Sequence, residues 1–407
     1  MEFLELTEDE FTNFADNHPL KSFLQTKQIA EIKKINGSDI YYVGVKNNNE
    51  IIAGTMIAAY GNFLGQKHFY SPRGFLLDYE DKELLNFFTK NIKKFVKEKK
   101  GYVLRIDPYI INKERDIDGN IVVDGVDNTH IVKHLESIGY IPLNKSEQCK
   151  WMYALDVENK TEDEIFKDMR QNTRNIIRKT LKTGITIREL SYDELDVFKK
   201  IAEDTSLRKN FKDKTLSYYQ NMYKLFKDKI KYLVAELDLN NYKKLLYSEK
   251  EEISLSISKL SDNKANDGKR KEMNNNISII ENKLKEADTL IEKHGDKILL
   301  SAGMFLLYGD ETVYLVSGNY AEFMKFNGQY LIQWEMIKYA INNGYKRHNF
   351  YGIMGNFDKN DKDYGIYEFK KGFNGYVIEL VGEFELPITI NYKIHKILSK
   401  IKSIIKK

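Results

Sequence analysis

The sequence predicts a mixed α/β protein of two units, the second of which is interrupted by a pair of long helices. Three observations predict this fold class. Strand-like and helix-like segments alternate over residues 1–155, and they alternate again over residues 156–238 and 296–390. Residues 239–295 differ from both stretches, because they are highly charged and repeat apolar residues seven apart. The length of 407 residues suits two or three domains. The similar size and alternation of the two units suggest a duplicated domain.

The first unit, residues 1–155, contains both kinds of pattern. Its expected helices are Phe23–Ile35, Asp81–Lys97 and His130–Ile138. Its expected strands are Ile40–Val45, Ile51–Ala59, His68–Gly74, Val103–Ile106 and Lys150–Leu155. The strand that begins at Val103 is expected to stop before Pro108, because proline has no N–H for the sheet.

The second unit is expected to open with a helix at Thr161, since Thr161 and Glu164 have the spacing of a capping box. Four cations follow at intervals of four, which places them on one helix face: Arg170, Arg174, Arg178 and Lys182. Two interpretations stay open, a solvated charged face or a stripe that contacts nucleic-acid phosphates. The other expected elements are strands Ile185–Arg188, Ile230–Leu237, Ile298–Leu307 and Thr312–Ser317, and helices Tyr192–Thr205 and Gln329–Asn342.

Residues 239–295 are expected to form an antiparallel coiled-coil hairpin. Apolar side chains lie seven apart on each side of the polar break Ser261–Gly268; they are Leu246, Ile253 and Leu260 before it and Ile277, Leu284 and Ile291 after it. Each helix would be about 30 Å long at 1.5 Å per residue.

The chain from Tyr345 to Glu379 is where we expect the chemistry. It reads as a strand Arg347–Tyr351, a glycine-rich polar loop, a short aromatic and basic helix Tyr367–Phe373, and a strand Tyr376–Phe384. Residues 391–407 form a basic amphipathic helix, with isoleucines opposite a series of lysines that includes Lys402, Lys406 and Lys407. This helix either docks on the protein or lies on an anionic membrane surface.

Composition narrows the function classes. The net charge is only +4, so any site for a polyanion must be a local patch. A single cysteine, Cys149, fits a reducing cytosol, and the acidic N-terminus is not a signal peptide. We find no HExxH, GxSxG or Walker motif, and the seven histidines are scattered, so we expect neither a metal site nor a bound cofactor.

Five motifs stand in an order that resembles the Fem family of peptidoglycan interpeptide-bridge aminoacyltransferases, along essentially the whole chain. They are FLQT with the following Lys33, YSPRG at Tyr70–Gly74, RIDPY at Arg105–Tyr109, NFYGIMGNFDK at Asn349–Lys359 and FKKGFNG at Phe369–Gly375. The last two are nearest to the MurM/MurN-type branching enzymes. The resemblance implies two acyltransferase domains of the GNAT type, the second interrupted by the coiled-coil arm. It also implies transfer of an amino acid (glycine, alanine or serine) from aminoacyl-tRNA to a stem-peptide or bridge amine of a lipid-linked precursor.

The same resemblance implies roles for individual residues. Lys33 and Lys214 match positions that bind the diphosphate of the precursor, and Tyr218 matches an adjacent contact with the precursor. A lysine at 214 lacks the bidentate recognition of arginine. Tyr314 matches a peptide-side position. Four residues within the motifs are expected to bind the acceptor as well: Tyr70, Arg73, Tyr109 and Tyr351. The positions matched to catalysis are Asp107, Phe350, Phe369 and Lys370.

The chemistry of the reaction agrees with these residue types. An aminoacyl ester is already activated, so positioning the amine about 3 Å from its carbonyl supplies much of the acceleration. Lys370 would stabilise the oxyanion, and Asp107 would orient the amine or accept its proton. Phe350 and Phe369 would exclude water. The alternatives are that Asp107 only caps a strand end and that the two phenylalanines only fill core.

The expected partners are aminoacyl-tRNA, bound by the Arg170–Lys182 stripe or the hairpin, the lipid-linked precursor, and the inner membrane surface. The hairpin could instead hold a protein, for example in a homodimer. The expected location is the cytoplasm or the inner face of the membrane. Two other functions stay open, an acyl-CoA-dependent N-acyltransferase and a non-catalytic scaffold that binds precursor. The Q/R-x-x-G-x-G/A loop of the former is missing from both halves.

Overall fold

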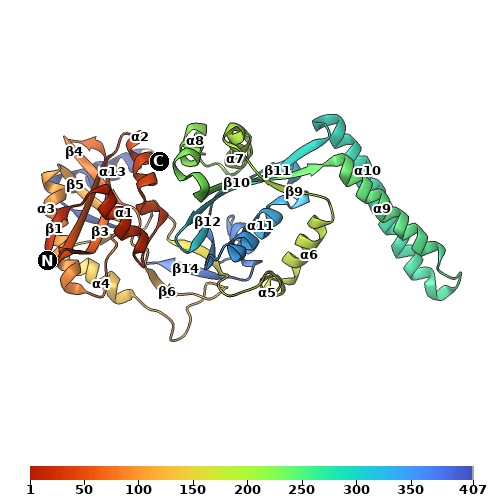
Figure 1. Ribbon diagram of the computed structural model, residues 1–407, viewed down its shortest axis with the longest axis horizontal. Helices are drawn as coiled ribbons and strands as arrows, with labels where there is room; N and C mark the ends of the chain where they lie inside the picture. The colour runs from red at the N-terminus through yellow and green to blue at the C-terminus, as the bar shows by residue number, and fades with distance from the viewer. Residues whose placement is uncertain (406–407) are drawn as a thin grey trace.

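The computed structural model describes residues 1–405, with side chains through residue 401, so Lys406, Lys407 and the side chains of residues 402–405 lie outside the description. Two mixed β-sheets lie side by side, and a helical hairpin projects from the second (Figure 1).

The first sheet has seven strands in the order β1-β2-β3-β4-β5-β15-β7. Their bounds are β1 (Glu2–Glu5), β2 (Asp39–Asn47), β3 (Glu50–Phe63), β4 (Gln66–Ser71), β5 (Gly101–Ile106), β15 (Phe384–Pro387) and β7 (Ile141–Pro142). The associated helices are α1 (Glu8–Asn17), η1 (Phe23–Gln25), α2 (Lys27–Ile35), α3 (Lys82–Glu98) and α4 (Thr129–Ser137).

The second sheet has eight strands in the order β6-β14-β8-β13-β12-β11-β10-β9. Their bounds are β6 (Ile111–Glu114), β14 (Tyr376–Leu380), β8 (Trp151–Asp156), β13 (Arg347–Ile353), β12 (Glu311–Asn319), β11 (Lys297–Tyr308), β10 (Ile230–Asp238) and β9 (Thr186–Glu189). The helices of this unit are α5 (Glu162–Asp168), α6 (Gln171–Leu181), η2 (Tyr192–Glu194), α7 (Leu195–Lys209), α8 (Leu216–Phe226), η3 (Lys227–Lys229), η5 (Ala321–Phe326), α11 (Gly328–Asn342) and α12 (Tyr364–Lys371).

The two sheets repeat one pattern. The run β1 to β5 and the run β9 to β13 both have antiparallel neighbours until the last pair, which is parallel in each. A helix connects each parallel pair, α3 in the first unit and α11 in the second. In the second sheet the parallel pairing covers only Glu311–Val313 against Arg347–Asn349, so the two strands separate beyond it. Side chains just past a parallel pair face an opening in the sheet, where ligand sites commonly form.

Some strands pair in the sheet of the other unit. β6 and β8 belong to the N-terminal stretch expected to form the first unit, yet they pair in the second sheet. β15 belongs to the stretch expected to form the second unit, yet it pairs in the first sheet. The chain therefore crosses between the sheets at 107–110, 115–140, 143–150 and 381–383. These crossings bring Asp107, Cys149 and Glu383 to the junction of the two units.

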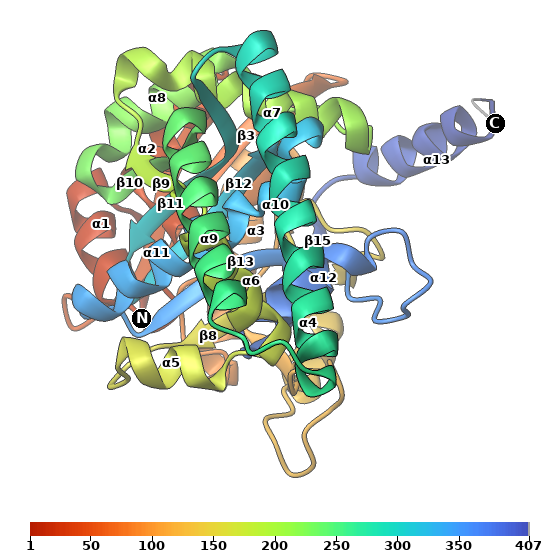
Figure 2. The same ribbon diagram turned by 90° about the vertical axis from the view of Figure 1, so that its right-hand side faces the viewer.

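The hairpin consists of α9 (Leu239–Ser258) and α10 (Asp267–His294), joined through η4 (Lys264–Asn266). It extends far beyond the second sheet (Figures 1 and 2). Its buried residues lie near its base and include Leu246 and Leu284 of the predicted repeat. Lys250 and Glu281 form an ion pair of 2.7 Å between the two helices.

Two predicted elements are wrong in extent. The single helix expected from Thr161 through Lys182 is split, because Met169 and Arg170 have extended ψ values of 151° and 142°. Met169 is buried there, and the Arg170 N–H donates to the Gly372 carbonyl at 3.0 Å. The strand expected over Tyr376–Phe384 is β14 plus β15, separated by Gly382 at φ 97°, a value that suits glycine.

The last helix, α13 (Ile390–Ile405), contacts the first unit through residues of its first half, which include Tyr392, His395 and Lys396. Tyr392 is buried beside Tyr102 and Val103, whereas Ile397 is 60% exposed. The helix projects from the body (Figure 2). Within residues 1–405, none of the helices combines the length and the apolar character needed to cross a bilayer.

Candidate active site

Two cations predicted to bind the diphosphate lie near each other at the junction of α2 and α8. Lys33 is at the end of α2, and Lys214 precedes α8, which packs against α2. Burial lowers the pKa of Lys33, and the nearby charge of Lys214 lowers it further, while Glu147 and Asp107 act in the opposite direction. The Lys33 ammonium lies 5.4 Å from the centre of the Tyr70 ring, and that of Lys214 lies 5.4 Å from the centre of the Tyr218 ring. Two close cations between tyrosine rings suit a dianionic ligand.

Asp107 follows β5, at the point where the parallel pair of the first sheet ends. One carboxylate oxygen, Oδ1, accepts hydrogen bonds from the Tyr70 hydroxyl and the Arg73 backbone N–H, both at 2.9 Å. The other, Oδ2, lies 3.2 Å from Arg73 Nη1 but has no hydrogen bond among the described residues. Burial raises the pKa of Asp107 to about 6, although Arg73 opposes the shift. Asp107 thus presents, at a buried position, one carboxylate oxygen with an ion pair but no hydrogen bond among the described residues, and its role beyond the strand end stays a prediction.

A second buried carboxyl group, Glu383, lies close to Asp107. Burial raises the pKa of Glu383 to about 7, and its neighbours include Arg105 and Asp107. Arg105 Nε lies 3.1 Å from Glu383 Oε1, and the Glu147 N–H donates to the other oxygen. The sequence analysis did not select Glu383. The available signal was the unusual density of acids in the strand-like segment that holds Glu379, Glu383 and Glu385.

Arg73 links the Asp107 cluster to the second unit. Its Nη2 donates to the Cys149 carbonyl at 2.8 Å, and its guanidinium lies 5.4 Å from the centre of the Tyr109 ring. Tyr109 in turn donates its hydroxyl proton to Glu311 on β12 at 3.3 Å. Cys149 lies close enough to Arg73, Lys370 and Asp107 for all three charges to affect its pKa, which burial raises. Cys149 therefore lies between the group formed by Arg73 and Asp107 in the first unit and Lys370 in the second.

Tyr351 has a strained backbone at this junction. Its φ is 62°, in the left-handed region that bulky residues avoid, and it lies at an irregularity in the pairing of β13 with β8. Asn349 Oδ1 accepts a hydrogen bond from the Tyr351 N–H at 2.8 Å and holds this conformation. The bulge turns the Tyr351 and Gly352 carbonyl groups toward Lys370. Backbone strain of this kind gathers at functional sites.

Lys370, on α12, is only 5% exposed. Its ammonium donates to the Gly352 carbonyl at 2.6 Å and the Tyr351 carbonyl at 3.3 Å, and no carboxylate among the described residues forms an ion pair with it. Burial lowers the pKa of Lys370 to about 7. Its third N–H has no partner in the described part of the chain, so it can donate to an incoming group.

The other predicted residues of the second unit, Phe350, Phe369 and Tyr314, belong to one apolar cluster of that unit. Phe350 is fully buried and packs edge-to-face on His348, with ring centres 4.6 Å apart. Phe369 is half-buried and contacts Tyr330. The Tyr314 hydroxyl accepts a hydrogen bond from Gln329 at 2.7 Å. His348, Gln329 and Gln333, which the sequence analysis did not select, complete a buried polar network in which Gln329 Oε1 and Gln333 Nε2 have no described partner.

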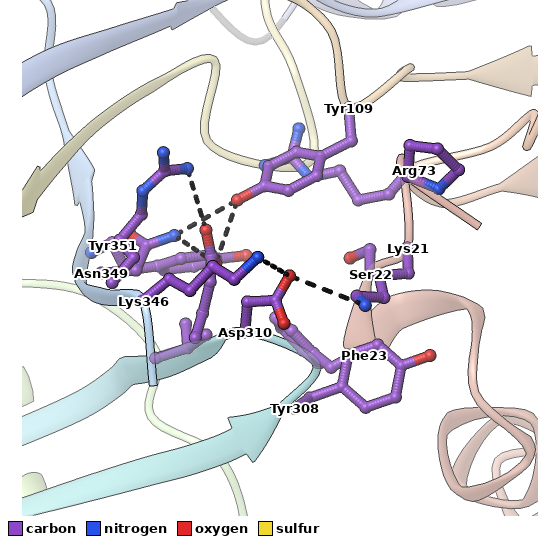
Figure 3. Close-up of a pocket in the computed structure, with 14 residues that line it drawn as sticks. Lys21, Ser22, Phe23, Arg73, Tyr109, Tyr308, Asp310, Lys346, Asn349 and Tyr351 are labelled. Atoms are coloured by element: carbon purple, nitrogen blue, oxygen red, sulfur yellow. Dashed lines mark hydrogen bonds and ion pairs between the residues drawn. The ribbon is translucent and has the colours of Figure 1, made fainter. Parts of the chain in front are cut away.

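A pocket of about 190 Å³ lies between the two units, and Arg73 forms part of its wall (Figure 3). Tyr109, Tyr351 and Arg73 line it, so three of the predicted acceptor residues share one cavity. Lys21 and Lys346 approach Asp310 across its mouth at 3.7 and 3.9 Å.

The four cations predicted to bind tRNA are not equivalent. Arg170 forms an ion pair with Glu368 of α12 at 2.9 Å, a partner that lies far away in the sequence. Arg178 is exposed and lies over the Phe166 ring, and Arg174 donates to the Lys167 carbonyl. Arg174, Arg178 and Lys182 keep their spacing of four along α6 and its cap. The α6 helix lies on the opposite side of the second unit from α2 (Figure 1). No group of three acidic, histidine or cysteine side chains among the described residues is arranged to hold a metal ion.

A family model and the similar proteins of known name all point to the same family. A family model described as the FemAB family matches residues 6–400. A Staphylococcus epidermidis protein named aminoacyltransferase FemA is 35% identical over 425 residues, which cover 99% of this chain and 100% of the relative. A Staphylococcus aureus protein of the same name is 35% identical over 424 residues, covering 99% of each. The nearness to the MurM/MurN type stays a prediction.

Solved structures agree on the fold. A crystal structure of FemX superimposes with a TM-score of 0.74 at 25% identity and covers 98% of this chain and 99% of its own. A tandem GNAT protein from the clavulanic acid biosynthesis pathway has a TM-score of 0.50 at 7% identity, with 95% and 98% covered. The predicted pair of GNAT-like units is therefore confirmed.

Proposed function

Because the chain belongs to the FemAB family and is an aminoacyltransferase, we propose that it transfers an amino acid (glycine, alanine or serine) from aminoacyl-tRNA to an amine of a lipid-linked peptidoglycan precursor. The amine belongs to the stem-peptide lysine or to the first bridge residue. The observation that carries the proposal is a series of contacts across the two units. Lys33 lies over the Tyr70 ring, the Tyr70 hydroxyl donates to Asp107, and Arg73 joins Asp107 to the Cys149 carbonyl. The charge of Lys370 in turn acts on Cys149. A precursor whose diphosphate binds at Lys33 would then place its amine at the buried junction of the two units. An aminoacyl ester beside Lys370 would meet the amine there.

In this proposal Lys33 and Lys214 bind the precursor diphosphate, with Tyr218 and Tyr70 beside them. Arg73, Tyr109 and Tyr351 line the path of the acceptor peptide, and Tyr314 contacts it in the second unit. Oδ2 of Asp107, which is ion-paired with Arg73 but has no hydrogen bond among the described residues, accepts a hydrogen bond from the attacking amine or takes its proton. Phe350 and Phe369 keep water from the ester.

The amine nitrogen attacks the ester carbonyl, and a negative charge develops on the carbonyl oxygen. The third N–H of the Lys370 ammonium donates to that oxygen. The bond between the carbonyl carbon and the ribose oxygen then breaks. The proton lost by the amine passes, directly or through Asp107, to that ribose oxygen, which leaves as a hydroxyl group. The products are an amide and uncharged tRNA. The reaction needs no metal or cofactor in this scheme, since the ester is already activated.

The tRNA would lie along Arg174, Arg178 and Lys182, through contacts mainly to phosphates. Arg170, which is paired with Glu368, would contribute less, and the hairpin is a second candidate surface for tRNA or for another copy of the protein. The exposed apolar face of α13 suits the inner surface of the membrane, where the lipid-linked acceptor is held.

A transfer assay tests the proposal. Charged tRNA carrying a labelled amino acid is incubated with lipid-linked precursor, and uncharged tRNA and acyl-CoA serve as controls. We expect label on the precursor only with charged tRNA, and Lys370→Ala should lower kcat by about 10²–10³-fold. Lys362→Ala, an exposed lysine just before α12, is the matched control and should retain full activity. Failure of every aminoacyl-tRNA to label the precursor would contradict the proposal.

A further inference from the structure

The last turn of α7 and the residues just after it expose two large apolar side chains that are four positions apart. Leu207 is 77% exposed and Phe211 is 53% exposed. Single exposed apolar residues are common, but a pair of this size beside a ligand site needs a reason. We define the wedge segment as residues 207–212.

The backbone of the wedge segment holds Phe211 in its exposed position. Asn210 has a φ of 55°, the Phe211 N–H donates to the Ser206 carbonyl, and the Asn210 N–H donates to the Leu207 carbonyl. This arrangement is a Schellman motif, in which the residue at the place of Phe211 usually packs on the residue at the place of Ser206. Because Ser206 is small and polar, Phe211 lacks that apolar partner and its ring stays in solvent.

The charges of the wedge segment are all positive. Arg208, Lys209 and Lys212 are exposed. The nearest acid, Asp213, is turned inward, where it pairs with Lys199 at 3.0 Å and accepts a hydrogen bond from the Tyr219 hydroxyl at 2.5 Å. A rigid apolar tip surrounded by cations complements an anionic lipid surface.

The wedge segment lies directly beside the proposed diphosphate site. Lys214 follows it by two residues, and Lys33 is near Lys214. α7 and α8 lie along the upper edge of the molecule in two perpendicular views (Figures 1 and 2). The diphosphate of a lipid-borne acceptor lies at the level of the lipid headgroups, so the surface around its site must face the bilayer.

We propose that the wedge segment is a membrane contact, with Leu207 and Phe211 entering the interface of an anionic bilayer and Arg208, Lys209 and Lys212 pairing with lipid phosphates. This inference rests on the proposed function, because it takes the acceptor to be lipid-linked. It assigns the wedge segment to a bilayer and not to a second protein.

The test compares Leu207→Ser/Phe211→Ser with Ile121→Ser/Val123→Ser. The control pair is matched, since Ile121 is 53% and Val123 is 84% exposed, and it lies in the loop after β6 at the lower edge of Figure 1. Full-length proteins are sedimented with vesicles of phosphatidylcholine and phosphatidylglycerol that contain no precursor. We expect the wedge variant to bind about tenfold more weakly, and the control to bind as the unsubstituted protein does. Transfer to a lipid-free, water-soluble precursor should be unchanged in both variants, and transfer to precursor in vesicles should fall only in the wedge variant.

Three outcomes would overturn the proposal: equal vesicle binding by the wedge variant and the unsubstituted protein, no vesicle binding by either, or an equal loss in the control variant. Loss of self-association with unchanged vesicle binding would also overturn it, and would assign the wedge segment to a contact between copies. Vesicle binding is measured without substrate. If no variant and no precursor gave any transfer, the proposed function would be contradicted. The vesicle sedimentation would still show whether the wedge segment binds a membrane.

Discussion

At the residue scale, the junction contains three buried ionisable groups whose pKa values move toward neutrality. Burial raises the pKa of Asp107 to about 6 and that of Glu383 to about 7, and it lowers the pKa of Lys370 to about 7. Such shifts gather at sites of proton transfer. None of them is visible in the sequence, because each depends on how much water the fold removes from the group.

The pH dependence of transfer follows from Asp107 and Lys370. Asp107 must be ionised to receive the amine, so its contribution rises with pH through about 6. Lys370 must be protonated to donate to the oxyanion, so its contribution falls as pH rises through about 7. Because both pKa values belong to the ligand-free protein, we expect a bell-shaped pH profile of kcat/KM for the acceptor.

Lys370→Arg separates these two limbs. An arginine stays protonated throughout the accessible range, so the falling limb should move to higher pH while the rising limb stays in place. Initial rates with the acceptor well below its KM, measured from about pH 5 to about pH 9, follow both limbs. A falling limb that stays near 7 in Lys370→Arg would show that another group causes it.

At the element scale, short tertiary contacts decide where elements end. α5 stops at Asp168 because Met169 is buried and Arg170 turns to the end of α12. Gly372 is needed at that contact, since a Cβ there would lie 2.2 Å from Thr173 Oγ1. The capping box at Thr161 was predicted from sequence and is confirmed, because its partners are three residues apart. The break at Met169 was missed, because its cause lies about 200 residues away.

The α6 cations carry a prediction about tRNA. Arg174→Glu/Arg178→Glu should raise KM for aminoacyl-tRNA at least about tenfold, and the salt dependence of tRNA binding should become shallower by about one unit per lost phosphate contact. Affinity for the precursor should stay the same. The measurements are steady-state kinetics and tRNA binding at several salt concentrations.

The control for this pair is Lys93→Glu/Lys97→Glu, which makes the same charge change on the exposed face of α3 in the first unit. An equal effect of the control would point to net charge as the cause. Equal losses of tRNA and precursor affinity in the α6 variant would count against a tRNA surface there.

At the scale of the whole molecule, the site exists because two similar sheets are joined by crossing chains. One core cluster includes Phe23 and Met56 of the first unit together with Tyr219 and Val234 of the second. The units therefore share apolar packing, and the groups at their junction are held in fixed relation. The exposed α13 and the hairpin, in contrast, add surfaces outside this shared core (Figure 2).

The α13 surface carries a separate membrane prediction. Ile394→Ser/Ile397→Ser/Ile401→Ser removes three exposed apolar side chains and leaves the buried Tyr392 and the Lys396–Glu385 ion pair of 2.5 Å in place. We expect weaker sedimentation with anionic vesicles by about tenfold and an unchanged thermal unfolding temperature. Sedimentation equal to that of the unsubstituted protein would show that α13 does not bind membranes.

The sequence by itself determined the local elements, the hairpin and the family. Helix caps, apolar periodicity and ordered motifs act over a few residues, so a linear chain displays them. Only the tertiary structure decided that β8 pairs in the second sheet, that Lys33 lies beside Lys214, and that Asp107 and Lys370 are neighbours across Cys149. These relations depend on strand pairing and burial between segments hundreds of residues apart, and no short stretch of sequence records either.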